Sequence, residues 1–135
     1  MPKKTNRNCY AHAFKLGIRP SWYHTQPGSI SGVYKKGAKK DYRCPTLINR
    51  VLKDNPDTFY QPNCEPCPKK YYKVALAIDP KNSDYHFYRK NGEPNLWSHK
   101  PGRNKVRYIS SNPYHMKRKN GKYTYSDWCG CFCTQ

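Results

Sequence analysis

Cys9 and two histidines, His86 and His99, are the residues whose types and order favour covalent chemistry. Cys9 lies at the predicted start of a helix, where the positive end of the helix dipole lowers a thiol pKa and favours the thiolate. That thiolate would attack a carbonyl carbon, with His86 as the base that first accepts and then returns the proton. His99, Asn95 or Ser98 would hold the imidazole tautomer, and the strand register decides which of them does so.

The same residues also have an ordinary structural interpretation. Cysteine is among the most buried residue types, and one near a helix start usually belongs to the core. His86 stands in an aromatic run, Tyr85-His86-Phe87-Tyr88, and fits a plain sheet position equally well. Gln26 is a candidate oxyanion donor, although it follows the cysteine along the chain. We therefore take a non-catalytic protein as the main prediction and a cysteine hydrolase as the alternative.

Two cysteine clusters could hold a metal ion. The first is a C-x-x-C knuckle between prolines, and the second is the alternating run at residues 129–133. Four thiolates from both clusters would make a tetrahedral zinc site that fastens the end of the chain to its middle. Disulfides across either cluster and free thiols are the alternatives, and seven cysteines leave at least one unpaired. The candidate zinc ligands are Cys64, Cys67, Cys129 and Cys131.

The chain carries 26 Lys and Arg against 8 Asp and Glu, a net charge of +18. Such a surface repels its own copies and attracts acidic partners. The basic residues are spread along the chain and interleaved with Tyr and Trp, which is compatible with base stacking. No RRM, KH or zinc-finger signature is present. The predicted polyanion- or partner-binding residues are Lys35, Lys36, Lys39, Lys40, Lys69, Lys70, Arg103, Lys105, Lys117, Arg118 and Lys119.

The elements that must position these residues form one domain of 135 residues. Asn8 caps a first helix that ends at Gly17, and a second helix covers 45–53 with Cys44 in the core at its start. Alternating patterns predict strands at 71–78, 84–90, 95–100, 105–109 and 122–125, with an Asn91-Gly92 turn. Helices followed by strands predict an α+β fold with a small antiparallel sheet.

No stretch reaches the roughly 20 apolar residues that a membrane span needs. The N-terminus is basic, but no apolar segment of the signal-peptide type follows it. We expect an intracellular origin and reduced thiols on these grounds.

Asn8-Cys9-Tyr10-Ala11 resembles the nucleophile segment of papain-like Cys–His hydrolases, including the CHAP amidase group. In those families the cysteine opens a helix, a histidine follows at the start of a strand, and a polar residue on the next strand orients it. Residues 8–16 and 84–100 show the same order. The resemblance implies a papain-like fold in which Cys9, His86 and His99 are catalytic.

Residues 84–113, together with Asn8-Cys9-Tyr10-Ala11 and Gln26-Pro27-Gly28, resemble a group of small proteins of large DNA viruses that infect algae and protists. In such viruses, small basic proteins rich in Pro and Tyr serve as minor capsid or cement components. The resemblance implies a structural virion protein, made in the host cell interior, whose acidic partners are capsid proteins. A protein that binds or condenses nucleic acid is the further alternative.

Overall fold

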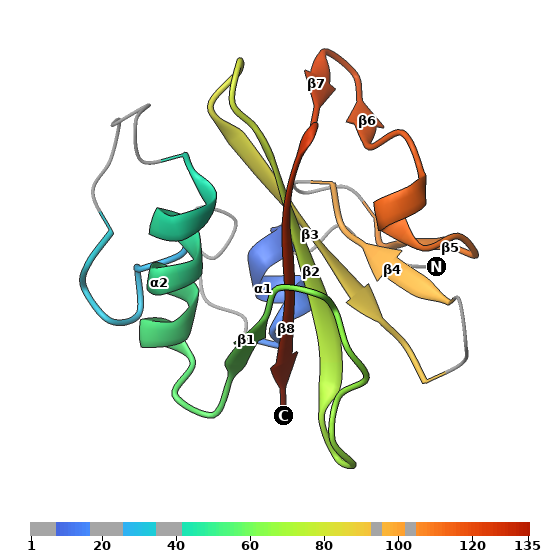
Figure 1. Ribbon diagram of the computed structural model, residues 1–135. Helices are drawn as coiled ribbons and strands as arrows, with labels where there is room; N and C mark the ends of the chain where they lie inside the picture. Colours follow the sequence, from blue (N-terminus) through green and yellow to red (C-terminus); the bar gives the residue numbers. More distant parts are fainter. Residues whose placement is uncertain (1–7, 17–25, 35–41, 93–95, 102–104) are drawn as a thin grey trace.

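The last strand of the chain lies inside the sheet, next to one of its edge strands. The computed structural model describes residues 8–16, 26–34, 42–92, 96–101 and 105–135. Within these residues a six-stranded antiparallel sheet has the order β1-β8-β2-β3-β4-β5, beside a small β6-β7 ladder (Figure 1). The elements are α1 Cys9–Ala13, α2 Cys44–Asp54, β1 Phe59–Gln61, β2 Tyr72–Asp79, β3 Asp84–Lys90, β4 Trp97–His99, β5 Arg107–Ile109, the 3-10 helix Pro113–His115, β6 Lys119–Asn120, β7 Tyr123–Thr124 and β8 Asp127–Thr134.

The predicted α+β class is confirmed, and both predicted helices are present. The Asn8 side chain accepts a hydrogen bond from the Ala11 amide at 3.0 Å, as expected of an N-cap. The helix ends before the predicted Gly17, because Lys15 already adopts a left-handed conformation with φ 53°. Gly17 itself lies outside the described residues. The second helix begins with Pro45 in its first turn, as predicted.

Five predicted strands correspond to β2, β3, β4, β5 and β7, whereas β1, β6 and β8 were not predicted. The sequence analysis does not predict β8, because it assigns the alternating cysteines of this segment to a metal site. Between Leu76 and Ala77 the β2–β8 register shifts, so that Cys129 is an extra residue in β8. This β-bulge changes the face on which the following side chains lie.

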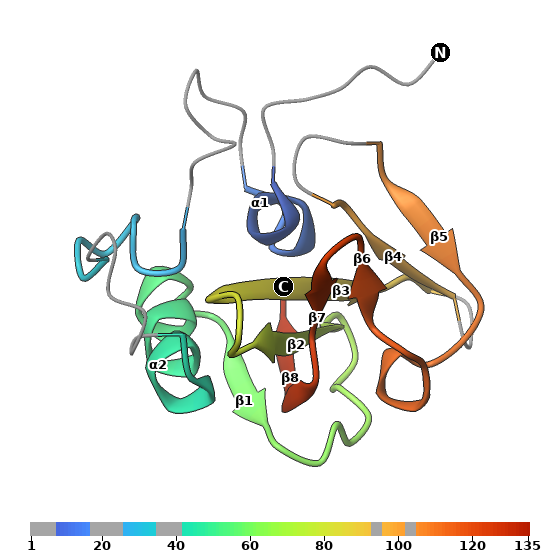
Figure 2. The same cartoon turned by 90° about the horizontal axis from the view of Figure 1, so that it is seen from above.

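The sheet has two differently covered faces. On the first, which we call the helix face, α1 packs against β3 and α2 against β8 (Figure 2). The second, which we call the far face, is covered by the segment before β2 and by the residues around β7 and β8. The helix face buries Tyr10, Leu47, Val51, Leu76, Phe87 and Phe132, and the far face buries Ala75, Ala77, Tyr88, Trp97, Tyr125 and Cys131.

Three disulfides fasten β8 to the rest of the fold: Cys44–Cys129, Cys64–Cys131 and Cys67–Cys133. The expectation of reduced thiols is therefore wrong for six of the seven cysteines. Cys44 is half-buried against the core, as predicted, but it is also a disulfide partner.

Among the described residues, no helix combines the length and the apolar character that crossing a bilayer requires.

Candidate functional site

The thiol of Cys9 is buried and not activated. Its residue is 7% exposed and packs in the helix-face cluster with Tyr10, Phe14 and Phe87. Burial raises the pKa of this thiol to about 12, and the hydrogen bond from the Phe87 backbone offsets only part of that rise. The prediction of a thiolate is therefore wrong, and Cys9 is a core residue.

His86 and His99 lie together on the far face. The distance from His86 Nε2 to His99 Nδ1 is 2.7 Å, and the His86 ring stacks on Tyr125 with a centroid distance of 5.2 Å. Burial, followed by the neighbouring His99 and His12, lowers the pKa of His86 to about 3. Of the candidates for orienting His86 among the described residues, His99 is the one in contact with it, but the contact joins two neutral rings in an aromatic environment.

The structure separates Cys9 from His86 by the thickness of the sheet. Successive residues of a strand point to opposite faces. Tyr85 and Phe87 belong to the helix face with Cys9, so His86, which lies between them, belongs to the far face with Tyr88 and Tyr125. The Cys9–His86 catalytic pair is therefore not assembled, and His99 orients His86 without facing a nucleophile.

The other proposed catalytic helpers have structural partners. Ser98 is buried on the helix face, where its Oγ lies 3.0 Å from His12 Nε2. The side-chain amide oxygen of Gln26 accepts a hydrogen bond from Tyr85 Oη at 2.5 Å. Asn95 lies outside the described residues.

The proposed zinc ligands are joined in disulfides instead. Cys64 pairs with Cys131, Cys67 with Cys133, and Cys129 with Cys44. A sulfur in a disulfide has no thiolate to offer a metal ion, so the zinc prediction is wrong. No group of three or more His, Cys, Asp or Glu in the described part of the chain is placed to hold a metal ion. The knuckle and the tail do meet, as predicted, through covalent bonds.

Three of the six acidic side chains in the described segments are turned inward. Asp54 accepts hydrogen bonds from Tyr10 Oη at 2.7 Å and from the amides of Gly28 at 2.7 Å and Ser31 at 2.8 Å. Asp79 accepts from the Thr124 amide at 3.0 Å and Asp84 from Tyr125 Oη at 2.8 Å. These carboxylates hold loops together, and the other three described acidic residues, Asp57, Glu65 and Asp127, are exposed.

Of the predicted basic residues, Lys69, Lys70, Lys105, Lys117 and Lys119 are exposed. Arg118 is not a free surface charge, because its guanidinium donates to the carbonyls of Tyr125, Pro113, Tyr114 and Ser126. It also lies over the Trp128 ring, 5.2 Å from the centroid. Arg118 is therefore a structural clamp. Lys35, Lys36, Lys39, Lys40 and Arg103 lie outside the described residues.

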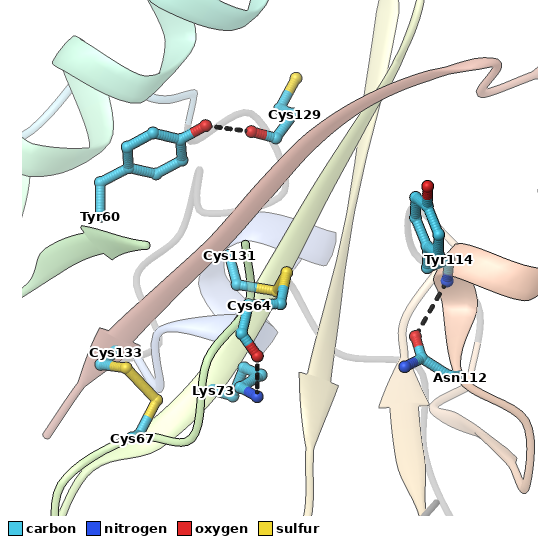
Figure 3. Close-up of a disulfide and its surroundings, with 9 residues drawn as sticks. All are labelled: Tyr60, Cys64, Cys67, Lys73, Asn112, Tyr114, Cys129, Cys131 and Cys133. Atoms are coloured by element: carbon cyan, nitrogen blue, oxygen red, sulfur yellow. Dashed lines mark hydrogen bonds between the residues drawn. A yellow bond between two sulfur atoms is a disulfide. The ribbon is translucent and has the colours of Figure 1, made fainter. Parts of the chain in front are cut away.

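A pocket of about 450 Å³ opens on the far face. The Cys64–Cys131 disulfide forms one side and the segment from Asn112 to Tyr114 lies opposite (Figure 3). Lys73 and Lys90 also line it, and the lining contains no acidic residue. Sequence reasoning missed this pocket, although a signal was present. The predicted strands 71–78 and 84–90, paired as an antiparallel hairpin, place the two lysines opposite each other.

Comparisons of the chain with protein-family models, with curated proteins and with solved structures find no match.

Proposed function

We propose that this protein is a non-catalytic basic module that binds polyanionic surfaces. In the setting implied by its resemblance to proteins of large DNA viruses, it would act within the virus particle, with acidic capsid proteins as partners. The observation that carries the proposal is the placement of charge in the described residues: the carboxylates of Asp54, Asp79 and Asp84 are hydrogen-bonded within the fold, whereas five of the predicted binding lysines are exposed. The whole chain carries a net charge of +18, which attracts polyanions.

The disulfides support a role as a rigid adhesive. Each joins residues far apart in the chain, with separations of 85, 67 and 66 residues. Cross-links of this kind restrict the unfolded chain, which helps a small domain withstand its own charge repulsion. A rigid module loses less conformational entropy when it binds, so scattered lysines can act together.

Affinity for immobilised heparin and for double-stranded DNA tests the proposal. We expect the logarithm of the DNA affinity to fall linearly with the logarithm of salt concentration, with a slope of about −0.9 per phosphate contacted. A quadruple variant, Lys69→Gln, Lys70→Gln, Lys117→Gln and Lys119→Gln, should elute at lower salt and give a shallower slope. The matched Lys→Arg variant at the same positions retains the charge and should behave as the parent.

The partner class is distinguished by adding polyglutamate. Binding to both polyglutamate and DNA with comparable salt slopes is expected of a general polyanion binder. Tight binding to DNA alone would favour the nucleic-acid alternative. A protein that stays monomeric and ignores heparin, DNA and polyglutamate at about 0.15 M salt would refute the proposal.

A further inference from the structure

The floor of the far-face pocket carries two lysines directly opposite each other. Val74 pairs with Arg89 across β2 and β3, so the next position of this antiparallel register places Lys73 opposite Lys90. Lys90 pairs in turn with Trp97 on β4. One row across the sheet therefore places two lysines and a tryptophan side by side, and all three residues line the pocket.

Two like charges facing each other on neighbouring strands destabilise a sheet. The Lys73 ammonium donates one hydrogen bond to the Cys64 carbonyl at 2.6 Å, which holds it at the pocket wall. Burial, together with the charge of Lys90, lowers the pKa of Lys73, and the Glu65 carboxylate offsets only part of this effect. Since none of the lining residues is acidic, an anion between the two ammonium groups would relieve their repulsion.

Aromatic rings surround the same space. Trp97 is buried, Trp128 is half-buried and Tyr114 is 56% exposed. Tyr114 and Trp128 meet edge to face with ring centroids 5.3 Å apart. Exposed or partly exposed aromatic faces near cationic groups stack on heteroaromatic bases, with about 1–3 kcal/mol for each base in other proteins.

The walls are fixed before any ligand arrives. The Cys64–Cys131 disulfide ties one wall to β8, and Arg118 holds the carbonyls of Pro113 and Tyr114 at the other. The Asn112 side chain accepts from the Tyr114 amide at 3.0 Å and sets the turn (Figure 3). A pocket of about 450 Å³ is in the size range of small-molecule sites.

We propose that this pocket binds a nucleotide, with its phosphate between Lys73 and Lys90 and its base against Trp128 and Tyr114. The nucleotide is either free or one unit of a single strand, since both present the same base and phosphate. This site is distinct from the exposed lysines that carry the proposed function, and it does not depend on them.

Isothermal titration calorimetry with AMP, at about 0.15 M salt, tests the site. We expect the parent to bind AMP, and we expect Lys90→Gln and Lys73→Gln each to weaken binding by about tenfold, because each removes a charged hydrogen bond. Trp128→Leu should weaken it similarly, whereas Trp128→Phe retains a ring and most of the affinity. Lys117→Gln, which removes an exposed charge outside the pocket, should leave AMP binding unchanged.

The ligand series decides the chemistry. Adenosine and inorganic phosphate should each bind far more weakly than AMP, because each lacks one half of the recognition. A short single-stranded oligonucleotide that is equally sensitive to Lys90→Gln would identify a strand as the source, and binding of AMP alone would identify a free nucleotide. Absence of AMP binding by the folded parent, or an equal loss in Lys117→Gln and Lys90→Gln, would overturn the site. Heparin binding measured on the same samples reports the proposed function separately.

Discussion

His86 Nε2 and His99 Nδ1 lie 2.7 Å apart and share one hydrogen bond across β3 and β4. Arg89 pairs with Ser98, so the same register places His99 opposite Tyr88 and diagonal to His86. One of the two nitrogens must donate and the other accept. If both rings carried two protons, two N–H groups would face each other. The pair therefore requires at least one neutral imidazole.

The surroundings of the pair keep it neutral. Tyr88 contacts the His86 ring with a centroid distance of 4.9 Å, and Tyr125 stacks on it. Burial lowers the pKa of His99, and the charge of Arg107 lowers it further. Among the interactions described for these two rings, no carboxylate accepts a hydrogen bond from either of them. Asp84 accepts its hydrogen bond from Tyr125 instead.

We expect the stability of the protein to fall as the pH decreases below about 6.5. The unfolded chain protonates His86 near that pH, whereas the folded protein does so only near pH 3. The unfolded state therefore binds more protons between these values, and His86 alone contributes a slope of up to about 1.4 kcal/mol per pH unit. Urea denaturation between about pH 7 and pH 5 measures this slope above the carboxylate range.

His86→Gln should flatten the pH dependence, whatever its effect on absolute stability. His115 is exposed on the 3-10 helix, so His115→Gln is the matched control and should retain the slope of the parent. Equal slopes in the parent and in His86→Gln would contradict the neutral, buried state of His86.

Thiol counting tests the disulfides and the state of Cys9 together. The folded protein, not reduced, should take up no alkylating reagent at neutral pH, because Cys9 is buried and its thiol has a pKa raised to about 12. After denaturation without reduction it should take up one group, and after reduction seven. Intact-mass spectrometry resolves these states. Seven groups without reduction, or one equivalent of bound zinc, would contradict the three disulfides.

The helices and the hairpin of β2 and β3 follow from local sequence patterns. Asn8 as a cap, Pro45 in a first turn and alternating residues around Phe87 each act through neighbours in the chain. The contact of His86 with His99 also follows, once the hairpin register is known. These features need no knowledge of how distant elements pack.

The position of Cys9 and the role of the cysteine tail depend on long-range packing. Whether Cys9 contacts His86 or Phe87 depends on which face of β3 is covered by α1. The sequences of α1 and β3 do not specify that face. In the tail, cysteines at 129, 131 and 133 have the period of a strand. The bulge then places Cys129 on the helix face and Cys131 on the far face. For this reason Cys129 pairs with Cys44 and Cys131 pairs with Cys64.

Removing the charge of Asp54 should weaken the attachment of the loop at residues 26–34 to the helix α2. Its carboxylate accepts three hydrogen bonds, from Tyr10, Gly28 and Ser31. Asp54→Asn replaces one acceptor oxygen by a donor that faces donors, so we expect a loss of about 2–3 kcal/mol in the free energy of unfolding. Asp57 is exposed, and Asp57→Asn, measured by the same urea denaturation, should change stability by less than about 0.5 kcal/mol. Similar effects of the two substitutions would exclude a clamping role for Asp54.

Gly130 permits the bulge that distributes the disulfides. Its φ is 108°, and a Cβ there would lie 3.0 Å from the Pro62 carbonyl oxygen and 3.0 Å from Tyr60 Oη. Gly130→Ala therefore combines backbone strain with a clash against β1 and the segment after it, and should cost about 2 kcal/mol or more. At Gly92 an added Cβ meets nothing within 4 Å, so Gly92→Ala should stay within about 0.5 kcal/mol of the parent. Thermal and urea denaturation of the oxidised proteins compare the two, and a tolerated Gly130→Ala would mean that β8 does not require the bulge.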